Sequence, residues 1–160
     1  MASSDTHILG LISDTHGLVR SGVHKALAGV ELILHAGDVG GQEILDELAL
    51  IAPVRAVLGN TDPPDFAGLA EEISMTVGGL NVHVSHGHEV GSPTPAKLAE
   101  RYDADVLVYG HTHRQLVTRV GGRLVINPGA AGPRRFNLRP SVGRLMITER
   151  NAEVEIVELS

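Results

Sequence analysis

Aspartate, asparagine and histidine gather in five short glycine-containing segments, and each segment follows an apolar stretch of chain. The segments are residues 13–17 (SDTHG), 37–38 (GD), 59–62 (GNTD), 86–88 (HGH) and 110–113 (GHTH). An apolar run that ends in a polar turn is typical of a buried strand followed by a loop. Ligands of open α/β sheets bind at the carboxyl ends of the strands, so five such loops can meet at one site.

The side chains in these loops are ligands for divalent metal ions. They are the carboxylates of Asp14 and Asp38, the amide of Asn60 and the imidazoles of His16, His86, His111 and His113. A mixed nitrogen and oxygen set without sulfur suits Mn, Fe, Zn, Co or Ni and argues against a structural zinc finger. Seven ligands are too many for one such ion and fit two ions that share a bridging carboxylate. Two ions roughly 3.5–4 Å apart promote in-line displacement at phosphorus, so we expect a dinuclear hydrolytic centre.

Each motif taken alone also fits an ordinary turn after a strand. The presence of all five in one chain favours a shared site over five unrelated turns. The other histidines are less definite. His35, two residues before Gly37, is either a support for the site or a plain strand residue. His88 is a candidate to contact substrate or to donate a proton, whereas His83 alternates on a strand and is expected to be half-exposed.

The first half of the chain predicts the elements that carry these loops. Strands are expected at residues 7–13, 32–35 and 54–58, and helices at 21–27 and 42–51. This alternation favours a parallel sheet with helical crossovers.

The second half predicts mostly strands. Two hairpins turn at Gly-Gly pairs, and a helix begins at Pro95 with Thr94 as its cap. The hairpins are residues 73–77 with 80–85 and 115–120 with 123–127, the helix is 95–102, and further strands are 106–109, 142–148 and 154–159. We expect one α/β domain over residues 1–160, with residues 1–6 as a flexible tail.

Composition narrows the class of protein. The 160 residues include no cysteine, which excludes disulfides and thiolate chemistry and makes a cytoplasmic location the default. The net charge of -6, without a basic block, argues against avid nucleic-acid binding. No apolar run approaches the roughly 20 residues that span a bilayer, and the first six residues do not resemble a secretory signal. We therefore expect no membrane span.

The ordered set of motifs resembles the calcineurin-like metallophosphoesterase superfamily. The short chain and residues 126–130 (INPGA) resemble its small YfcE-like phosphodiesterase branch. The resemblance implies a four-layer α/β/β/α sandwich of two mixed β-sheets flanked by helices, the metallo-dependent phosphatase fold. It also implies two metal ions and a metal-bridging hydroxide as nucleophile.

The resemblance also assigns roles by motif. It implies that Asp14, His16, Asp38 and His113 hold the first ion. It implies that Asp38, Asn60, His86 and His111 hold the second ion, with Asp38 as the bridge. Asp38, Asn60 and His88 are the residues expected to act in catalysis. Mn is the expected metal, and Ni, Co, Zn and Fe remain open.

Two departures from the family pattern refine the expected activity. Many relatives carry histidine where this chain has Thr61, whose hydroxyl is too weak an acid to protonate a leaving group. Help must then come from His88, from water or from nothing, so diesters with good leaving groups are the expected substrates. The Asp-Arg-Gly motif of phosphoprotein phosphatases is missing, which disfavours protein dephosphorylation.

The expected substrate contacts come from two loops. Thr61, Asp62, Arg134 and Arg135 are the candidates, although the arginines also fit a solvated loop. Small phosphodiesters, including nucleotide-type ones, are the leading substrate class. The alternatives are a metal-dependent phosphomonoesterase, a nuclease, or a non-catalytic metal-binding scaffold like the retromer subunit of this fold. All seven ligand positions carry ligating side chains, which favours catalysis. A homo-oligomer is compatible with the sequence.

Overall fold

The computed structural model describes residues 6–135 and 137–159. Residues 1–5 of the expected tail lie outside the described residues. Thr6, the last residue of that tail, is already part of the first strand, where it pairs with Thr148.

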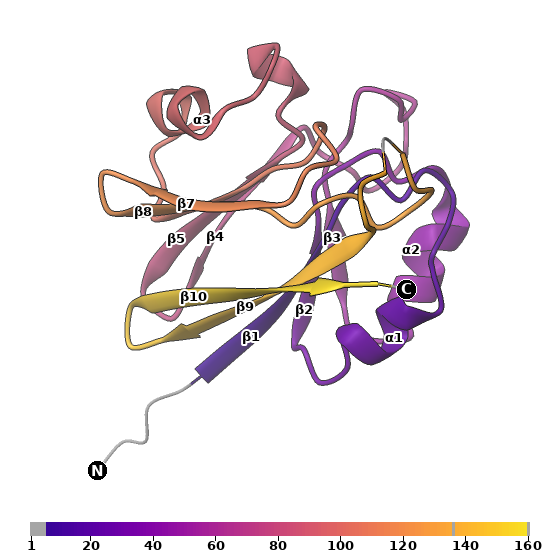
Figure 1. Cartoon of the computed structure of the whole chain (residues 1–160), viewed down its shortest axis with the longest axis horizontal. Helices are drawn as coiled ribbons and strands as arrows, with labels where there is room; N and C mark the ends of the chain where they lie inside the picture. Colours follow the sequence, from indigo (N-terminus) through magenta and orange to yellow (C-terminus); the bar gives the residue numbers. More distant parts are fainter. Residues whose placement is uncertain (1–5, 136, 160) are drawn as a thin grey trace.

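The first part of the chain and the C-terminal hairpin together build a five-stranded sheet with the order β10-β9-β1-β2-β3. β1, β2 and β3 run parallel, while β9 and β10 are antiparallel to their neighbours. The strands are β1 (Thr6–Ile12), β2 (Leu32–His35), β3 (Val54–Ala56), β9 (Ser141–Thr148) and β10 (Asn151–Glu158). Figure 1 shows α1 (Gly22–Ala26) and α2 (Gln42–Leu48) together on the outer face of this sheet. The predicted crossovers are confirmed.

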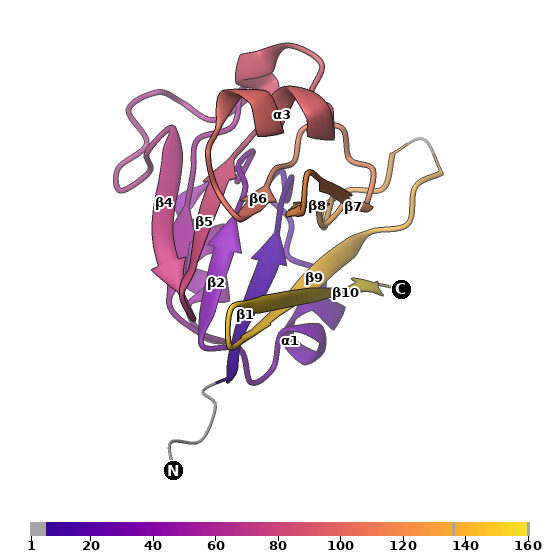
Figure 2. The same ribbon diagram turned by 90° about the vertical axis from the view of Figure 1, so that its left-hand side faces the viewer.

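The second half builds a second five-stranded sheet with the order β4-β5-β6-β8-β7. β5, β6 and β8 run parallel, and the two predicted hairpins form its edges. The strands are β4 (Glu72–Val77), β5 (Leu80–Ser85), β6 (Val106–Val108), β7 (Leu116–Val120) and β8 (Arg123–Asn127). α3 (Pro95–Arg101) covers this sheet from outside, and a short 3₁₀ turn, η1 (His88–Val90), precedes it (Figure 2). The Thr94 hydroxyl accepts a hydrogen bond from the amide of Lys97, as expected of the residue that caps the N-terminus of α3.

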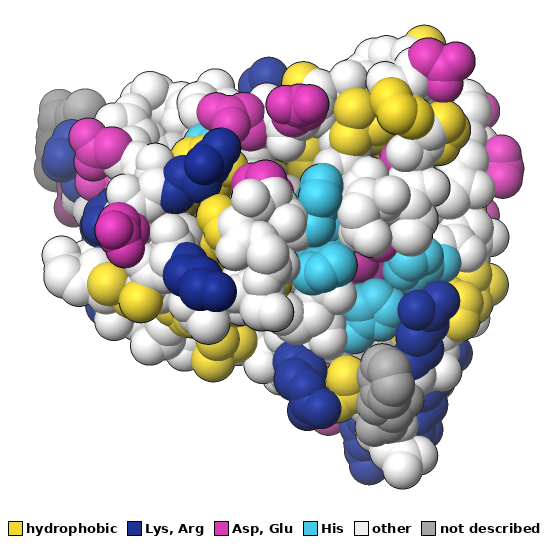
Figure 3. Space-filling view, turned by 90° about the horizontal axis from the view of Figure 1, so that it is seen from above, with side chains coloured by type: hydrophobic (Ala, Val, Ile, Leu, Met, Phe, Trp, Pro, Cys, Tyr) yellow, Lys and Arg dark blue, Asp and Glu magenta, His cyan; other side chains and the backbone are white. Residues whose placement is uncertain are grey.

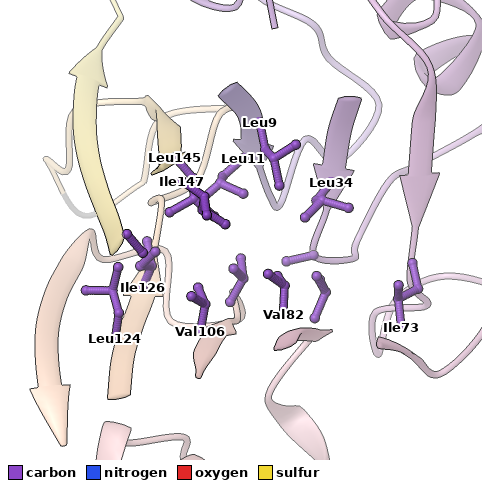
Figure 4. Close-up of a cluster of buried hydrophobic side chains, with 14 of the residues drawn as sticks. Leu9, Leu11, Leu34, Ile73, Val82, Val106, Leu124, Ile126, Leu145 and Ile147 are labelled. Atoms are coloured by element: carbon purple, nitrogen blue, oxygen red, sulfur yellow. The ribbon is translucent and has the colours of Figure 1, made fainter. Parts of the chain in front are cut away.

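Three separate cores hold four layers together. The largest lies between the sheets and includes Leu9, Leu11, Val82, Val106 and Ile126 (Figure 4). A second core packs the first sheet against α1 and α2, and a third packs the second sheet against α3. Successive side chains of a strand point to opposite faces, and the central strands β1, β2 and β6 bury side chains on both faces. The observed architecture is the expected α/β/β/α sandwich.

One buried histidine differs from expectation. The sequence predicts a half-exposed His83, yet His83 is only 5% exposed. Its ring stacks on the ring of Tyr102, and the two ring centroids lie 3.9 Å apart. The prediction was wrong because Tyr102, directly after α3, covers the outer face of β5. Within the described residues no helix combines the length and the apolar character needed to cross a membrane.

Candidate metal centre

The five predicted loops meet at one end of the two sheets. The loops after β1 and β2 are joined by two backbone hydrogen bonds, which the amide of Asp14 donates to Gly37 O (2.9 Å) and the amide of His16 donates to Asp38 O (3.0 Å). The loops after β5 and β6 are joined by a bond from the amide of Gly110 to His86 O (3.0 Å). Figure 3 shows the histidine side chains near the middle of this face. The convergence expected from the strand-end positions is therefore observed.

Asp14, His16 and His113 form one group of converging ligand atoms. The Nε2 atoms of His16 and His113 lie 3.8 Å and 3.5 Å from Asp14 Oδ1, and 3.3 Å from each other. Asp14 is fully buried, and Oδ1 has no hydrogen-bond partner among the described residues. A buried carboxylate oxygen without a partner costs free energy unless a cation compensates it. This geometry fits a metal ion.

Asp14, Asp38 and His86 form a second group that shares Asp14 with the first. His86 Nε2 lies 3.3 Å from Asp38 Oδ2 and 3.8 Å from Asp14 Oδ1. The Nδ1 atom of His86 donates a hydrogen bond to Ala36 O at 2.8 Å, which leaves Nε2 as the ligand atom. Asp38 Oδ2 also lies 3.6 Å from His16 Nε2. Asp38 thus faces histidines of both groups, as a bridging carboxylate would.

Each carboxylate has one oxygen held by the protein and one directed at the histidines. Asp14 Oδ2 accepts the hydroxyl of Ser13 (2.6 Å) and the amide of His111 (3.1 Å). Asp38 Oδ1 accepts the amide of Thr61 at 2.9 Å. These bonds fix the rotation of both side chains, so that Asp14 Oδ1 and Asp38 Oδ2 point into the site.

The pKa shifts favour ionised carboxylates. Burial raises the pKa of Asp14, but the nearby ring of His113, the charge of His86 and the hydrogen bond from Ser13 outweigh it and hold the pKa low. Burial also raises the pKa of Asp38, yet His86 and Thr61 more than offset this. Burial lowers the pKa of His16 and of His111, whereas the carboxylates of Asp38 and Asp14 outweigh burial at His86 and raise its pKa. Negative carboxylates and neutral imidazoles are the forms that bind metal ions.

Left-handed backbone is concentrated at the site. Eight non-glycine residues within 6–135 and 137–159 have positive φ, and five of them are predicted ligands. These are Asp14 (53°), His16 (45°), Asp38 (56°), His111 (73°) and His113 (65°). Such conformations cost on the order of 1 kcal/mol each and persist where the surrounding structure enforces them. Sequence patterns gave no sign of this strain.

A buried chain of hydrogen bonds supports the first two loops. The amide of Gly37 donates to His35 Nδ1 (3.0 Å), so His35 carries its proton on Nε2 and donates to Thr15 Oγ1 (2.9 Å). The Thr15 hydroxyl in turn donates to Val39 O at 2.7 Å. Burial lowers the pKa of His35 to about 4, which keeps the ring neutral. His35 thus has contacts suited to the support role and none that identify it as a ligand.

The carboxylate of Asp62 binds backbone amides of the site loops. Its carboxylate accepts the amides of Val39 (2.9 Å), Gly40 (3.2 Å) and Gly59 (3.0 Å), and the residue is 7% exposed. These bonds tie the Asp38 loop to the Asn60 loop. The structure therefore favours a positioning role for Asp62 over the predicted contact with substrate.

Asn127 is a residue whose role sequence reasoning missed. Its Nδ2 donates to Gly110 O (3.1 Å) and to Thr112 Oγ1 (3.0 Å), and its Oδ1 accepts the amide of Gly129 (2.9 Å). Asn127 is fully buried. It therefore fixes the loop that carries His111 and His113. The available signal was its place at the start of the NPGA segment.

The remaining predicted residues surround the two groups. The ring of His111 lies 5.2 Å from that of His86, and the ring of His88 lies 5.3 Å from that of His86. Asn60 is exposed beside Thr61. Arg134 and Arg135 are also exposed, and Arg135 is near enough to His16 to lower its pKa, although burial contributes more.

A cleft of about 300 Å³ adjoins the centre. Its walls come from the loop after β3, the start of β4, η1 and the end of α3, and Asn60 and His88 line its side toward the metal ligands. A substrate bound at the ligand groups could extend into this space. The cleft is open, as expected for a chain without an inserted cap.

Comparisons with known proteins show the family to which the chain belongs. Residues 8–150 match the family model described as the calcineurin-like phosphoesterase superfamily domain. A probable metallophosphoesterase of Methanothermobacter thermautotrophicus is 33% identical, over 94% of this chain and 91% of that protein. A phosphodiesterase of Methanocaldococcus jannaschii is 30% identical, over 93% of this chain and 98% of that protein.

A solved structure has the same architecture. Vacuolar protein sorting 29 of Cryptosporidium parvum superposes with a TM-score of 0.81 at 25% identity, over 97% of this chain and 98% of that one. The family match covers most of the chain and includes all five ligand-bearing loops. The chain therefore belongs to the calcineurin-like phosphoesterase superfamily.

Proposed function

We propose that the protein is a dinuclear-metal-dependent phosphodiesterase that hydrolyses small phosphodiesters. One observation carries the proposal: Asp14 Oδ1 and Asp38 Oδ2 face the ring nitrogens of His16, His86 and His113, while the opposite carboxylate oxygens are held by the protein. The phosphodiesterase from Methanocaldococcus jannaschii supports the diester as substrate class.

The donor groups suggest how two ions would be held. Asp14, His16, Asp38 and His113 would hold one ion, and Asp38, Asn60, His86 and His111 the other. Divalent ions at such a site supply Lewis acidity at phosphorus and lower the pKa of bound water to around 7. We propose Mn as the native metal, with Ni, Co, Zn and Fe as alternatives that an imidazole-rich site accepts.

His88 is the residue best placed to act on the ester group. It is exposed, lines the cleft and lies beside His86. Thr61 cannot serve as an acid, and its amide is already used by Asp38. We propose that His88 contacts the ester oxygen or the group that leaves. Asn60 would contact the phosphoryl group.

The test is a comparison of diester and monoester hydrolysis. Protein stripped with a chelator and restored with Mn²⁺ is assayed on bis-p-nitrophenyl phosphate and p-nitrophenyl phosphate. We expect metal-dependent turnover that favours the diester. Asp38→Asn should lower kcat/KM about 100-fold or more, because it weakens the carboxylate that we propose bridges the two ions. Asp46→Asn, on the exposed face of α2, is the matched control.

Two results would redirect the proposal. Preference for the monoester would make the protein a phosphomonoesterase. No hydrolysis with Mn²⁺, Ni²⁺, Co²⁺ or Zn²⁺, despite two bound ions, would favour a non-catalytic scaffold. The likeness to vacuolar protein sorting 29 is the observation that keeps this second candidate in view.

A further inference from the structure

The cleft beside the metal ligands, named here the acidic cleft, carries an excess of negative charge. Among the described residues that line it, the side chains of Asp62, Glu71, Glu72 and Glu89 are carboxylates and Arg101 is the one guanidinium. Figure 3 shows acidic side chains above the histidines and Lys or Arg side chains below them. Arg134 and Arg135 belong to the loop after β8, away from the cleft walls. The two approaches to the site therefore differ in charge.

The inner wall of the acidic cleft is preformed. The carboxylate of Glu89 accepts the amide of Gly87 (2.9 Å) and the hydroxyl of Tyr102 (2.8 Å). The ring of Tyr102 is backed by His83, and the guanidinium of Arg101 lies 5.4 Å from its centroid. His83 Nε2 lies 3.5 Å from Glu72 Oε1, and this buried ring has no hydrogen-bond partner among the described residues. Glu72 is thus placed beside His83 of β5, and Glu89 is held by Gly87 and by Tyr102, which directly follows α3.

A bound phosphodiester would present its own negative charge to the metal ligands and extend one ester group past Asn60 and His88. A second anionic group in that position would be repelled by the cleft carboxylates. A cationic group would be attracted, and the guanidinium of Arg101 compensates only part of the negative charge.

We propose that the acidic cleft binds the alcohol portion of a phosphodiester in which that alcohol carries a positive charge, as in an amino alcohol. This inference rests on the proposed function, because it assumes that the phosphoryl group sits at the metal ligands. It assigns Glu71 and Glu72 as specificity-determining residues. Both are exposed, so their charges can be removed without opening the core.

The test uses a pair of ligands that differ only in charge. Phosphocholine and 3,3-dimethylbutyl phosphate, its uncharged carbon analogue, are titrated into the Mn²⁺-loaded protein by calorimetry. We expect phosphocholine to bind about fivefold more tightly at low salt, and this preference to shrink as ionic strength rises. Glu71→Gln/Glu72→Gln should reduce the ratio to about one. Glu153→Gln/Glu155→Gln, which removes the same charge from exposed positions of β10, should leave it unchanged.

Equal binding of the two ligands by the wild-type protein, or no binding of either, would overturn the inference. Persistence of the preference in the Glu71→Gln/Glu72→Gln variant would overturn it as well. Hydrolysis of the choline and 3,3-dimethylbutyl esters of p-nitrophenyl phosphate distinguishes a failure of this inference from a failure of the proposed function. If both esters are hydrolysed without preference and both ligands bind equally, the proposed role of the acidic cleft is refuted and the proposed phosphodiesterase function stands. If phosphocholine binds more tightly but neither ester is hydrolysed, the role of the acidic cleft stands and the phosphodiesterase function is refuted.

Discussion

Replacing Asp62 by asparagine changes one oxygen of a carboxylate that accepts three backbone amides. Oδ1 accepts Val39 and Gly40, while Oδ2 accepts Gly59 at 3.0 Å and a longer bond from Val39 at 3.1 Å. An asparagine oxygen can keep the Oδ1 bonds, but its NH₂ group then faces the amide of Gly59. Val39 and Gly59 are buried, so water cannot replace the lost bond.

The expected cost follows from these contacts. An unsatisfied buried donor costs about 1–3 kcal/mol, and the two remaining bonds lose their charge assistance. We expect Asp62→Asn to lower the free energy of unfolding by about 3 kcal/mol. At a urea m-value of about 2 kcal/mol/M this moves the midpoint by about 1.5 M. Because Asp62 joins the loops that carry Asp38 and Asn60, Mn²⁺ affinity should fall about tenfold or more.

Urea unfolding of the metal-free protein, followed by circular dichroism, measures the stability change, and calorimetry measures Mn²⁺ binding. Asp103→Asn, an exposed change of the same chemistry, should shift stability by less than about 0.5 kcal/mol. The reasoning is refuted if Asp62→Asn keeps wild-type stability and Mn²⁺ affinity but raises KM for bis-p-nitrophenyl phosphate. That combination of results would support the sequence prediction that Asp62 contacts the substrate.

Three further predictions concern the supports and the leaving group. His35 is fully buried with a pKa lowered from 6.5 to about 4, so its neutral form contributes stability that is present above pH 6.5 and lost as the pH falls toward 4. In urea unfolding, the stability advantage of the metal-free wild type over His35→Gln should shrink by about 2 kcal/mol from pH 7 to pH 5, and an unchanged advantage would contradict this. Asn127→Ala should weaken Mn²⁺ binding about 10- to 100-fold in calorimetry, with exposed Asn151→Ala as control, because the loop of His111 and His113 loses its clamp. Without a strong acid at Thr61, p-nitrophenyl diesters should turn over at least about 100-fold faster than dialkyl esters, and equal rates would show efficient protonation of the leaving group.

The strand-forming segments could be predicted because apolar runs ended at clear turn signals. β2 was predicted with its observed bounds, since Leu32–His35 is followed at once by Ala36-Gly37. α2 was predicted to reach Ile51 but ends at Leu48, where Ala49 and Leu50 become exposed. The strand order of the second sheet could not be predicted. β8 pairs with β6 rather than ending the sheet, and that choice depends on packing between segments far apart in sequence.

The candidate ligands could be predicted from residue type and from their place after strands. The sequence could not predict the roles of Asp62, Asn127 and His83. Each role depends on which backbone groups or rings the tertiary fold brings next to the side chain. A carboxylate that binds three amides and one that binds substrate look alike in a sequence. The same limit applies to the left-handed backbone at Asp14, His16 and Asp38, which is imposed by neighbouring loops.

Each ligand group draws its donors from both sheets. Asp14, His16 and Asp38 follow strands of the first sheet, while His86 and His113 follow strands of the second. An ion bound by either group would cross-link the two halves of the sandwich at their open end, so its binding free energy would add to the resistance of the whole fold to unfolding. The dependence is mutual. A cavity made between the sheets, far from any ligand, would let them shift and would be measured as a loss of metal affinity.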